Sequence, residues 1–374
     1  MAKSTYYATI DYGQITNNAR AIINSTNVPL MAVVKADAYG HGLVESARAA
    51  IAGGATYLGV AFIEEAVTLR DAGITTPILA WLTPPSDNFA KALDFTIDLS
   101  VSSFAQLDSI LTASELTGVK PRIHLKVDTG MTRSGVLDEF PELVSAIGQL
   151  LDDEKIILVG TWSHLACADE PSHPLNREQY ERFLAALDYL ASEGINPGIR
   201  HLANSGAIVH FPDFHFDMVR SGLLLYGYFP GGIKSNQFSV QPVMELRADI
   251  ALVKRVPAGA TIGYGASVSL SKDSYIALVP LGYADGIPRT LKTPVNITIN
   301  GRPYPLIGRV SMDQITVDLG SETTIKAGDT AIFFGGEGAV TAEDWAKAAG
   351  TISYEILSRI GGRVPRLARE INPY

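Results

Sequence analysis

One lysine stands directly after an apolar run near the start of the chain. The segment reads Ala32-Val33-Val34-Lys35-Ala36-Asp37-Ala38-Tyr39-Gly40-His41-Gly42. Its pattern predicts a buried strand that ends at Lys35, followed by a loop into a helix from Leu43. Because burial disfavours the charged ammonium, Lys35 is a candidate nucleophilic amine. A lysine that extends its charged end from the strand into solvent is an equally good interpretation of this segment alone.

Polar residues also follow several later apolar runs. They are Arg133 after Arg122–Val127, His164 after Ile157–Trp162, Asn204-Ser205-Gly206 after Ile199–Leu202, and Arg220-Ser221-Gly222-Leu223 after Phe216–Val219. Taken singly, the Ser-Gly pairs are ordinary turn chemistry, and a histidine at a strand end is more often a core residue. Their shared position after successive runs indicates a common site.

The first two thirds of the chain alternates short apolar runs with amphipathic helical stretches. The predicted strands are Leu30–Lys35, Tyr57–Ala61, Ile78–Trp81, Phe95–Leu99, Arg122–Val127, Ile157–Trp162, Ile199–Leu202 and Phe216–Val219. The predicted helices are Asp11–Asn24, Leu43–Ala52, Glu64–Ala72, Phe104–Leu116, Pro141–Leu151 and Asn176–Glu193. This alternation favours an α/β fold, a (β/α)8 TIM barrel whose site lies at the carboxyl ends of the strands. An open doubly wound sheet remains the alternative.

The residue composition of the sequence changes after the eighth predicted strand. Residues 227–239 combine glycines, a proline and polar residues, which predicts a linker. Beyond it we expect strands at 245–254, 275–280, 295–299, 314–317 and 330–334, a hairpin at Asn300-Gly301, a helix from the cap Thr341 through Ala349, and a short helix at Ile352–Ile360. We therefore expect a barrel domain at residues 8–234 and a mainly β C-terminal domain at residues 235–374. The N-terminal strand, residues 1–7, is a candidate member of the second domain.

Composition limits the classes of partner. The chain has 374 residues and a net charge of −9, an acidic balance that argues against nucleic acid or an anionic membrane as a partner. Its one cysteine, Cys167, is typical of a reducing compartment. No apolar run is long enough for a membrane span and no export signal is visible, so we expect a soluble cytoplasmic protein. The seven histidines are scattered, and we expect no metal site.

A nucleophilic lysine together with an anion cradle narrows the chemistry. In (β/α)8 barrels, the loops after strands seven and eight often bind phosphate through backbone N–H groups. The segments that begin at Asn204 and Arg220 are candidates for these two loops. Two options follow: Lys35 forms a Schiff base with a substrate carbonyl, or it forms one with pyridoxal 5'-phosphate (PLP), whose ring is an electron sink.

These segments resemble those of the bacterial alanine racemases, a fold-type III family of PLP-dependent enzymes. The resemblance includes Ala32 to Gly42, Lys126 to Gly135, Ser163-His164, Ala203-Asn204-Ser205, Arg220 to Gly227, Gly263-Tyr264-Gly265, Pro280 to Gly286, Gly308 to Gln314, Tyr354 to Leu357, and Arg363 to Arg366. It extends over nearly the whole chain in the same order. It implies a PLP-binding barrel and a β domain that work as a homodimer with shared active sites.

The resemblance implies two acid–base residues. Lys35 would hold PLP and exchange a proton on one face of the substrate, and Tyr264 of the partner subunit would do so on the other face. Since a free tyrosine loses its proton only at about pH 10, a hydrogen-bond chain from Tyr264 to His164 and Arg220 would assist it. Arg220 would also face the pyridine nitrogen. An arginine only donates, so that nitrogen would stay unprotonated and the electron sink would be weak.

The remaining site residues follow from the same resemblance. Tyr39, Ser205, Tyr354 and the backbone of Gly222 and Leu223 would hold the phosphate, with Asn204 beside it and Trp81 near the cofactor. Arg133 and Met312 of the partner subunit would bind the substrate carboxylate, and Tyr283 and Asp313 would line the entrance. Lys126 matches a lysine that some relatives carry as a carbamate.

The implied activity is the interconversion of L- and D-alanine, which would supply D-alanine for peptidoglycan. A racemase of broader preference, or one that prefers serine or lysine, would differ only in pocket contacts worth about 1–3 kcal/mol. A PLP amino-acid decarboxylase tends to place a carboxylate opposite the pyridine nitrogen, where this chain has Arg220. A PLP-carrier protein resembles the barrel alone.

Overall fold

The fold was analysed in a computed structural model, which describes residues 4–232, 235–336 and 338–369. The chain forms two compact units. The first, which we call the barrel unit, contains residues 13–38 and 43–241. The second, which we call the β unit, contains the described residues up to Tyr12, the short segment Tyr39–Gly42, and the chain from Pro242 onward.

The barrel unit is built on eight parallel strands. These are β2 (Leu30–Val33), β3 (Tyr57–Val60), β4 (Ile78–Ala80), β5 (Asp98–Val101), β6 (Arg122–Lys126), β7 (Ile157–Trp162), β8 (Ile199–His201) and β9 (Val219–Ser221). They pair in the order β8-β7-β6-β5-β4-β3-β2-β9. The Arg220 N–H donates to the Ala203 carbonyl at 3.0 Å, so the chain segments at the two ends of this order also meet. The structure therefore confirms a nearly closed (β/α)8 barrel and not an open doubly wound sheet.

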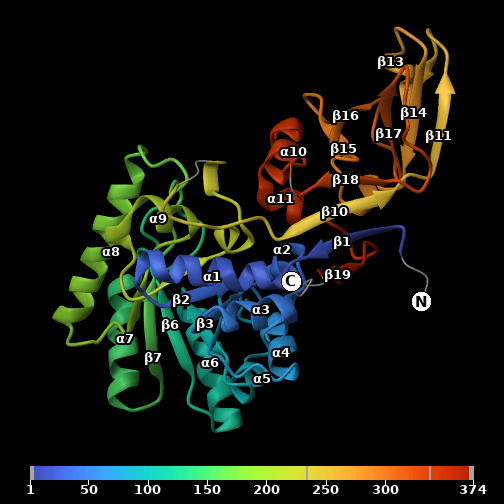
Figure 1. Ribbon diagram of the computed structural model, residues 1–374. Helices are drawn as coiled ribbons and strands as arrows, with labels where there is room; N and C mark the ends of the chain where they lie inside the picture. Colours follow the sequence, from blue (N-terminus) through green and yellow to red (C-terminus); the bar gives the residue numbers. More distant parts are fainter. Residues whose placement is uncertain (1–3, 233–234, 337, 370–374) are drawn as a thin grey trace. The chain divides into compact units, whose positions relative to one another are not determined.

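Helices cover the outside of these strands (Figure 1). They are α1 (Tyr12–Thr26), α3 (Leu43–Ala52), α4 (Ile63–Asp71), α5 (Phe89–Asp94), α6 (Phe104–Thr117), α7 (Phe140–Asp152), α8 (Leu175–Ser192) and α9 (Ser205–His210), with the 3-10 turns η1 (Pro212–Phe214), η2 (Leu223–Tyr226) and η3 (Pro230–Gly232). The predicted apolar face of α8 is buried at Phe183, Leu187 and Leu190. Sequence patterns did not predict α5, because six residues are too few to show a helical period.

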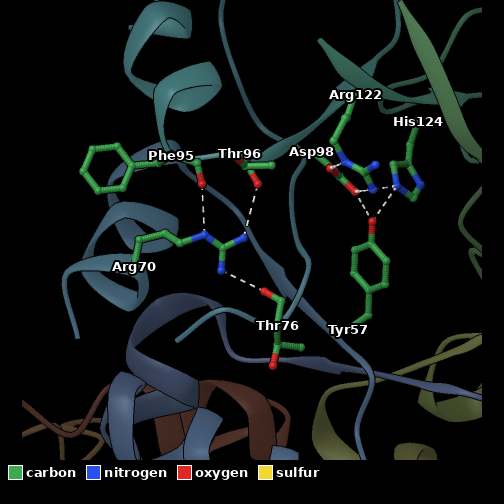
Figure 2. A network of polar contacts seen from close by, with 8 residues as sticks. All are labelled: Tyr57, Arg70, Thr76, Phe95, Thr96, Asp98, Arg122 and His124. Carbon is green, nitrogen blue, oxygen red and sulfur yellow. Dashed lines mark hydrogen bonds and ion pairs between the residues drawn. The ribbon is translucent and has the colours of Figure 1, made fainter. Parts of the chain in front are cut away.

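Two barrel strands begin later than predicted. The predicted strand at Phe95–Leu99 begins only at Asp98, because Phe95 and Thr96 close α5 and their carbonyls accept hydrogen bonds from Arg70 at 3.0 and 3.2 Å (Figure 2). The predicted strand at Phe216–Val219 begins only at Val219. Phe216 has a φ of 49°, which an extended strand does not tolerate.

The β unit contains a nine-stranded sheet in the order β11-β14-β17-β16-β15-β18-β10-β1-β19. Its strands are β1 (Tyr6–Ile10), β10 (Met244–Asp249), β11 (Leu252–Val256), β14 (Ser274–Val279), β15 (Asn296–Ile299), β16 (Arg302–Ile307), β17 (Ile315–Gly320), β18 (Thr330–Phe334) and β19 (Arg366–Ala368). β12 (Thr261–Ile262) pairs with β13 (Val268–Ser269), and the helical elements are η4 (Tyr264–Ala266), η5 (Tyr283–Asp285), α10 (Ala342–Ala349) and α11 (Ser353–Ser358).

Most expectations for this unit agree with the structure. Residues 245–254, predicted as one strand, form two: β10 pairs with β1 and β18, whereas β11 pairs with β14. The predicted hairpin joins β15 to β16 through Asn300 and Gly301, both of which have positive φ, as a tight hairpin turn requires. Thr341 caps α10 as predicted.

The segment predicted to be a linker, residues 227–239, is partly packed. Tyr228 and Phe238 are buried in the barrel unit. Residues 233 and 234 of this segment lie outside the described residues. Across the described ranges, none of the helices has the length and apolar character that a membrane crossing requires.

Candidate active site

Lys35 lies two residues after Val33, the last residue of the buried strand β2. The N–H of Val34 donates to the carbonyl of Gly59 at 2.9 Å, which holds this end of β2 against β3. Lys35 is half-buried. Burial, followed by the nearby charge of Arg133, lowers the pKa of the Lys35 amine, and Glu65 partly opposes them. The position and the direction of this shift agree with a nucleophilic amine.

The segment after Lys35 is a left-handed helical turn, where we had predicted a loop. It spans α2 (Lys35–Gly40), and Ala36 to Tyr39 have φ values between 53° and 56°. Each such residue costs roughly 1–2 kcal/mol, so the turn needs partners that hold it. The Glu65 carboxylate accepts from the Ala36 N–H at 2.6 Å and from the Ala61 N–H at 2.9 Å.

Glu65 is a residue that sequence reasoning missed. It stands at the third position of α4, where a glutamate is ordinary capping chemistry. Its contact with Ala36, the neighbour of Lys35, depends on the pairing of β2 with β3 and was not visible in the sequence.

His164 follows β7 and is surrounded by positive charge. Burial lowers its pKa well below the usual value, and Arg220, Arg133, Lys126 and Lys35 act in the same direction. We call these four residues the cation cluster. The imidazole is therefore neutral, and its Nδ1 lies 3.3 Å from Nη2 of Arg220. Because a guanidinium only donates, Nδ1 accepts and the proton of the ring is on Nε2.

Arg220 is buried in β9 and is held by several acceptors. Nη1 donates to the His201 carbonyl at 2.7 Å and lies 3.2 Å from His201 Nδ1, and Nη2 donates to the Ser163 carbonyl at 2.7 Å. Among the described residues, the hydrogen bonds of Arg220 all use Nη1 or Nη2, and none uses the Nε–H. Burial lowers the pKa of Arg220 to about 9, which leaves the guanidinium charged at neutral pH.

Lys126 and Arg133 complete the cation cluster. The Lys126 amine contacts the Ser134 hydroxyl and lies 4.3 Å from the centre of the Trp162 ring. Burial, then Arg220 and Arg133, lowers the pKa of Lys126 to about 8. Arg133 is exposed in the loop after β6. Trp81 packs against Trp162, with 5.9 Å between their rings.

The loops after β8 and β9 meet at Ser205. Its hydroxyl oxygen accepts from the N–H groups of Gly222 at 3.1 Å and Leu224 at 3.4 Å. Asn204 caps α9 by accepting from the Ala207 N–H at 3.2 Å. Among the described residues, the N–H of Leu223 has no backbone acceptor. The structure thus brings together the two loops predicted to form an anion cradle.

The other predicted site residues belong to the β unit. Tyr39 and Tyr354 have ring centres 5.9 Å apart. Tyr264 and Met312 expose 70% and 53% of their surface, respectively. Asp313 accepts from Arg363 at 2.6 Å, a contact that sequence reasoning did not predict. Tyr283 begins η5, where its N–H donates to the Ser311 carbonyl at 3.0 Å.

Several buried polar residues inside the barrel were also missed. Asp98, His124 and His201 lie on β5, β6 and β8, and Figure 2 shows Asp98 with Tyr57, Arg122 and His124. Their only sequence signal is a polar residue inside an apolar strand, which does not reveal that they contact one another.

Comparisons with known proteins find the same family in both halves of the chain. The family "Alanine racemase, N-terminal domain" matches residues 10–230, and "Alanine racemase, C-terminal domain" matches residues 243–368. The chain is 44% identical to an alanine racemase of Frankia casuarinae, over 96% of this chain and 95% of that protein.

Solved structures give the same result. The alanine racemase of Streptomyces lavendulae superposes with a TM-score of 0.95 and is 44% identical, covering 99% of this chain and 98% of that one. An alanine racemase of Bacillus anthracis, solved with bound L-Ala-P, has a TM-score of 0.88 at 32% identity and covers 99% of this chain and 96% of that one. The fold and the relatives agree, and the chain belongs to the alanine racemase family.

Proposed function

We propose that this protein is a PLP-dependent racemase that interconverts L- and D-alanine, the latter a precursor of peptidoglycan. The observation that carries the proposal is the cation cluster around the neutral His164, in a chain of the alanine racemase family. PLP carries a phosphate and the substrate carries a carboxylate. A barrel mouth rich in positive charge attracts both anions.

The donors present fit this cofactor. The Arg220 Nε–H suits a ring nitrogen that accepts a hydrogen bond. The Ser205 oxygen already accepts two N–H groups, so its own hydrogen can be donated to a phosphate oxygen. The residues proposed to hold PLP are Lys35, Tyr39, Trp81, Arg133, His164, Asn204, Ser205, Arg220, Gly222, Leu223 and Tyr354. We also propose that the protein has a barrel domain at residues 8–234 and a C-terminal domain at residues 235–374, and that the barrel domain supplies most of the residues that hold PLP.

Two side chains of this protein move the proton. When bound, PLP supplies an electron sink that acidifies the α-proton of the amino acid. Lys35, whose burial favours the neutral amine, takes or returns this proton at Nζ. Tyr264 does the same at its phenolic oxygen on the opposite face. Arg133 and Met312 bind the substrate carboxylate, and Tyr283 and Asp313 line the entrance.

The proposal includes a homodimer in which Tyr264 and Met312 serve the site of the other subunit. Both side chains are largely exposed in the chain as described, although each is apolar over most of its surface. Contact with a partner subunit would remove this apolar surface from water. A two-fold arrangement would form two equivalent sites.

The test of the activity uses the purified protein with L-alanine, L-serine and L-lysine in deuterium oxide. We expect α-proton exchange and D-isomer formation, fastest for alanine, together with a visible absorbance band that Lys35→Ala removes. A cofactor band without any D-isomer would refute the racemase and favour decarboxylation or PLP carriage. Faster reaction of serine or lysine would retain the chemistry and change the substrate.

The test of shared sites mixes two inactive variants, Lys35→Ala and Tyr264→Phe, under conditions that exchange subunits. If each site combines Lys35 of one subunit with Tyr264 of the other, every mixed dimer contains one intact site. Random exchange of subunits should then restore about a quarter of the wild-type activity. A mixture that stays inactive, although mass spectrometry detects mixed dimers, would refute sharing.

A further inference from the structure

A chain of buried polar side chains crosses the inside of the barrel and ends at Arg220. His201 Nδ1 lies 3.2 Å from Nη1 of Arg220, and His201 Nε2 lies 3.0 Å from Nδ1 of His124. His124 Nε2 lies 3.2 Å from the Tyr57 hydroxyl and 3.5 Å from Oδ2 of Asp98. Asp98, His124 and His201 are each at most 1% exposed. We call Asp98, His124 and His201 the interior chain.

The hydrogen bonds of the interior chain have one possible direction. Arg220 can only donate, so His201 Nδ1 accepts. Burial, then the charges of Arg220 and His124, lowers the pKa of His201 well below its usual value, so this ring is neutral and carries its proton on Nε2. That N–H donates to His124 Nδ1, which leaves the proton of His124 on Nε2, where it faces Tyr57 and Asp98.

The far end of the interior chain is a buried anion. Asp98 accepts from Arg122 at 2.6 and 3.3 Å and from the Tyr57 hydroxyl (Figure 2). Burial raises the pKa of Asp98, but hydrogen bonds from His124 and Arg122 outweigh burial and lower it. An ionised carboxylate only accepts. The interior chain therefore links a permanent donor, Arg220, to a permanent acceptor, Asp98. Neither histidine can move its proton to the other ring nitrogen without losing a hydrogen bond.

Packing holds the His201 ring in place. The rings of Trp162 and His201 stack with their centres 5.6 Å apart and an interplanar angle of 5°. The guanidinium of Arg220 lies 4.8 Å from the centre of the Trp162 ring. The His124 ring meets His201 edge-on at 5.1 Å. Barrel interiors are usually filled by branched apolar residues. Three polar residues at such positions cost desolvation, which a purely structural core would avoid.

We propose that His201, supported by His124 and Asp98, is a positioning residue for Arg220. The His201 ring accepts from Nη1, beside the His201 carbonyl, and helps to fix the rotation of the guanidinium. The Nε–H would then stay available to donate to the ring nitrogen of the cofactor. The inference rests on the proposed PLP-binding function. It concerns a residue that, on this assignment, touches neither the cofactor nor the substrate.

The first test measures the interior chain in the purified wild-type protein and needs no activity. Nitrogen-15 NMR of labelled imidazoles distinguishes the two neutral tautomers. We expect His124 and His201 both to carry the proton on Nε2. A proton on Nδ1 of either ring would overturn the proposal, whatever the outcome of the racemase assay.

The second test compares three variants of the PLP-loaded enzyme. His201→Phe keeps a ring against Trp162 and keeps the backbone carbonyl that accepts from Arg220 Nη1. Of the hydrogen bonds with Arg220, it removes only the one from Nη1 to the ring nitrogen. His201→Asn keeps an acceptor near the Nδ1 position. His215→Phe is the matched control, because His215 is a buried histidine of the same unit that contacts the Ile208 carbonyl at 3.1 Å and not the interior chain.

We expect His201→Phe to shift the absorbance band of the bound cofactor and to lower kcat about 10- to 100-fold with little change in KM. His201→Asn should restore part of both, and His215→Phe should change neither. A wild-type band and kcat in His201→Phe, or equal changes in His215→Phe, would overturn the proposal. Failure of the wild type to bind PLP would instead refute the proposed function and leave the tautomer result standing.

Discussion

Replacing Asp98 with asparagine should destabilise the barrel unit far more than the same change at an exposed position. Asp98 is buried, and its carboxylate accepts two hydrogen bonds from Arg122. Asparagine keeps the size of the side chain but removes the charge and one acceptor oxygen. The substitution leaves the guanidinium of Arg122 without its counter-ion.

The magnitude follows from the burial of the pair. Breaking a buried ion pair by removing one partner costs about 3–5 kcal/mol. The side chain of Arg122 is 33% exposed, so water partly solvates the unpaired guanidinium. We therefore expect a loss of about 2–4 kcal/mol, which lowers the melting temperature of a unit of 150–250 residues by roughly 4–16 °C.

The matched control is Asp217→Asn. Asp217 forms a similar two-bond contact with Arg200, with both distances 2.8 Å, but its side chain is 39% exposed. Exposed pairs contribute about 0–1 kcal/mol, so this variant should melt within about 4 °C of wild type. Thermal unfolding followed by circular dichroism measures both. Equal shifts for the two variants would refute the argument that burial decides the cost.

Three further predictions concern single groups of the candidate site. Glu65→Gln removes one acceptor oxygen, so hydrogen exchange at the Ala36 amide should speed up about 10- to 100-fold. In the neighbouring control Glu64→Gln, exchange at the same amide should match wild type. Equal rates in both variants would contradict the role of Glu65. Because the pKa of His164 is lowered in the folded protein, this residue takes up a proton near its ordinary pKa of about 6.5 only in the unfolded chain. The free energy of unfolding should therefore fall by up to about 1.4 kcal/mol per pH unit as the pH falls from 7 to 5. Unfolding in urea measures it, and a urea midpoint that rises on acidification would contradict this sign. With a pKa of about 8, Lys126 has enough neutral amine to add carbon dioxide and release a proton, so carbon-13 NMR under labelled carbon dioxide should show a carbamate signal that Lys126→Arg lacks.

The sequence alone predicted the elements whose signal is local. Period-two and apolar runs located all eight barrel strands, although β5 and β9 began later than expected. A helical period located six helices of the barrel unit, and an Asn-Gly turn located the hairpin of β15 and β16. The resemblance also pointed to Lys35, and the structure gives this lysine a lowered pKa.

Only the tertiary structure decided which polar residues meet. His124 and His201 are separated by 77 residues and Tyr57 and Asp98 by 41, and each contact exists because parallel strands of the barrel bring inward-facing positions together. The left-handed turn after Lys35 is likewise held by Glu65, which lies 29 residues beyond Ala36. A sequence pattern reports whether a residue is buried, because burial repeats along one element. It does not report which other buried residue it faces, because that depends on how the strands pair and how the barrel closes.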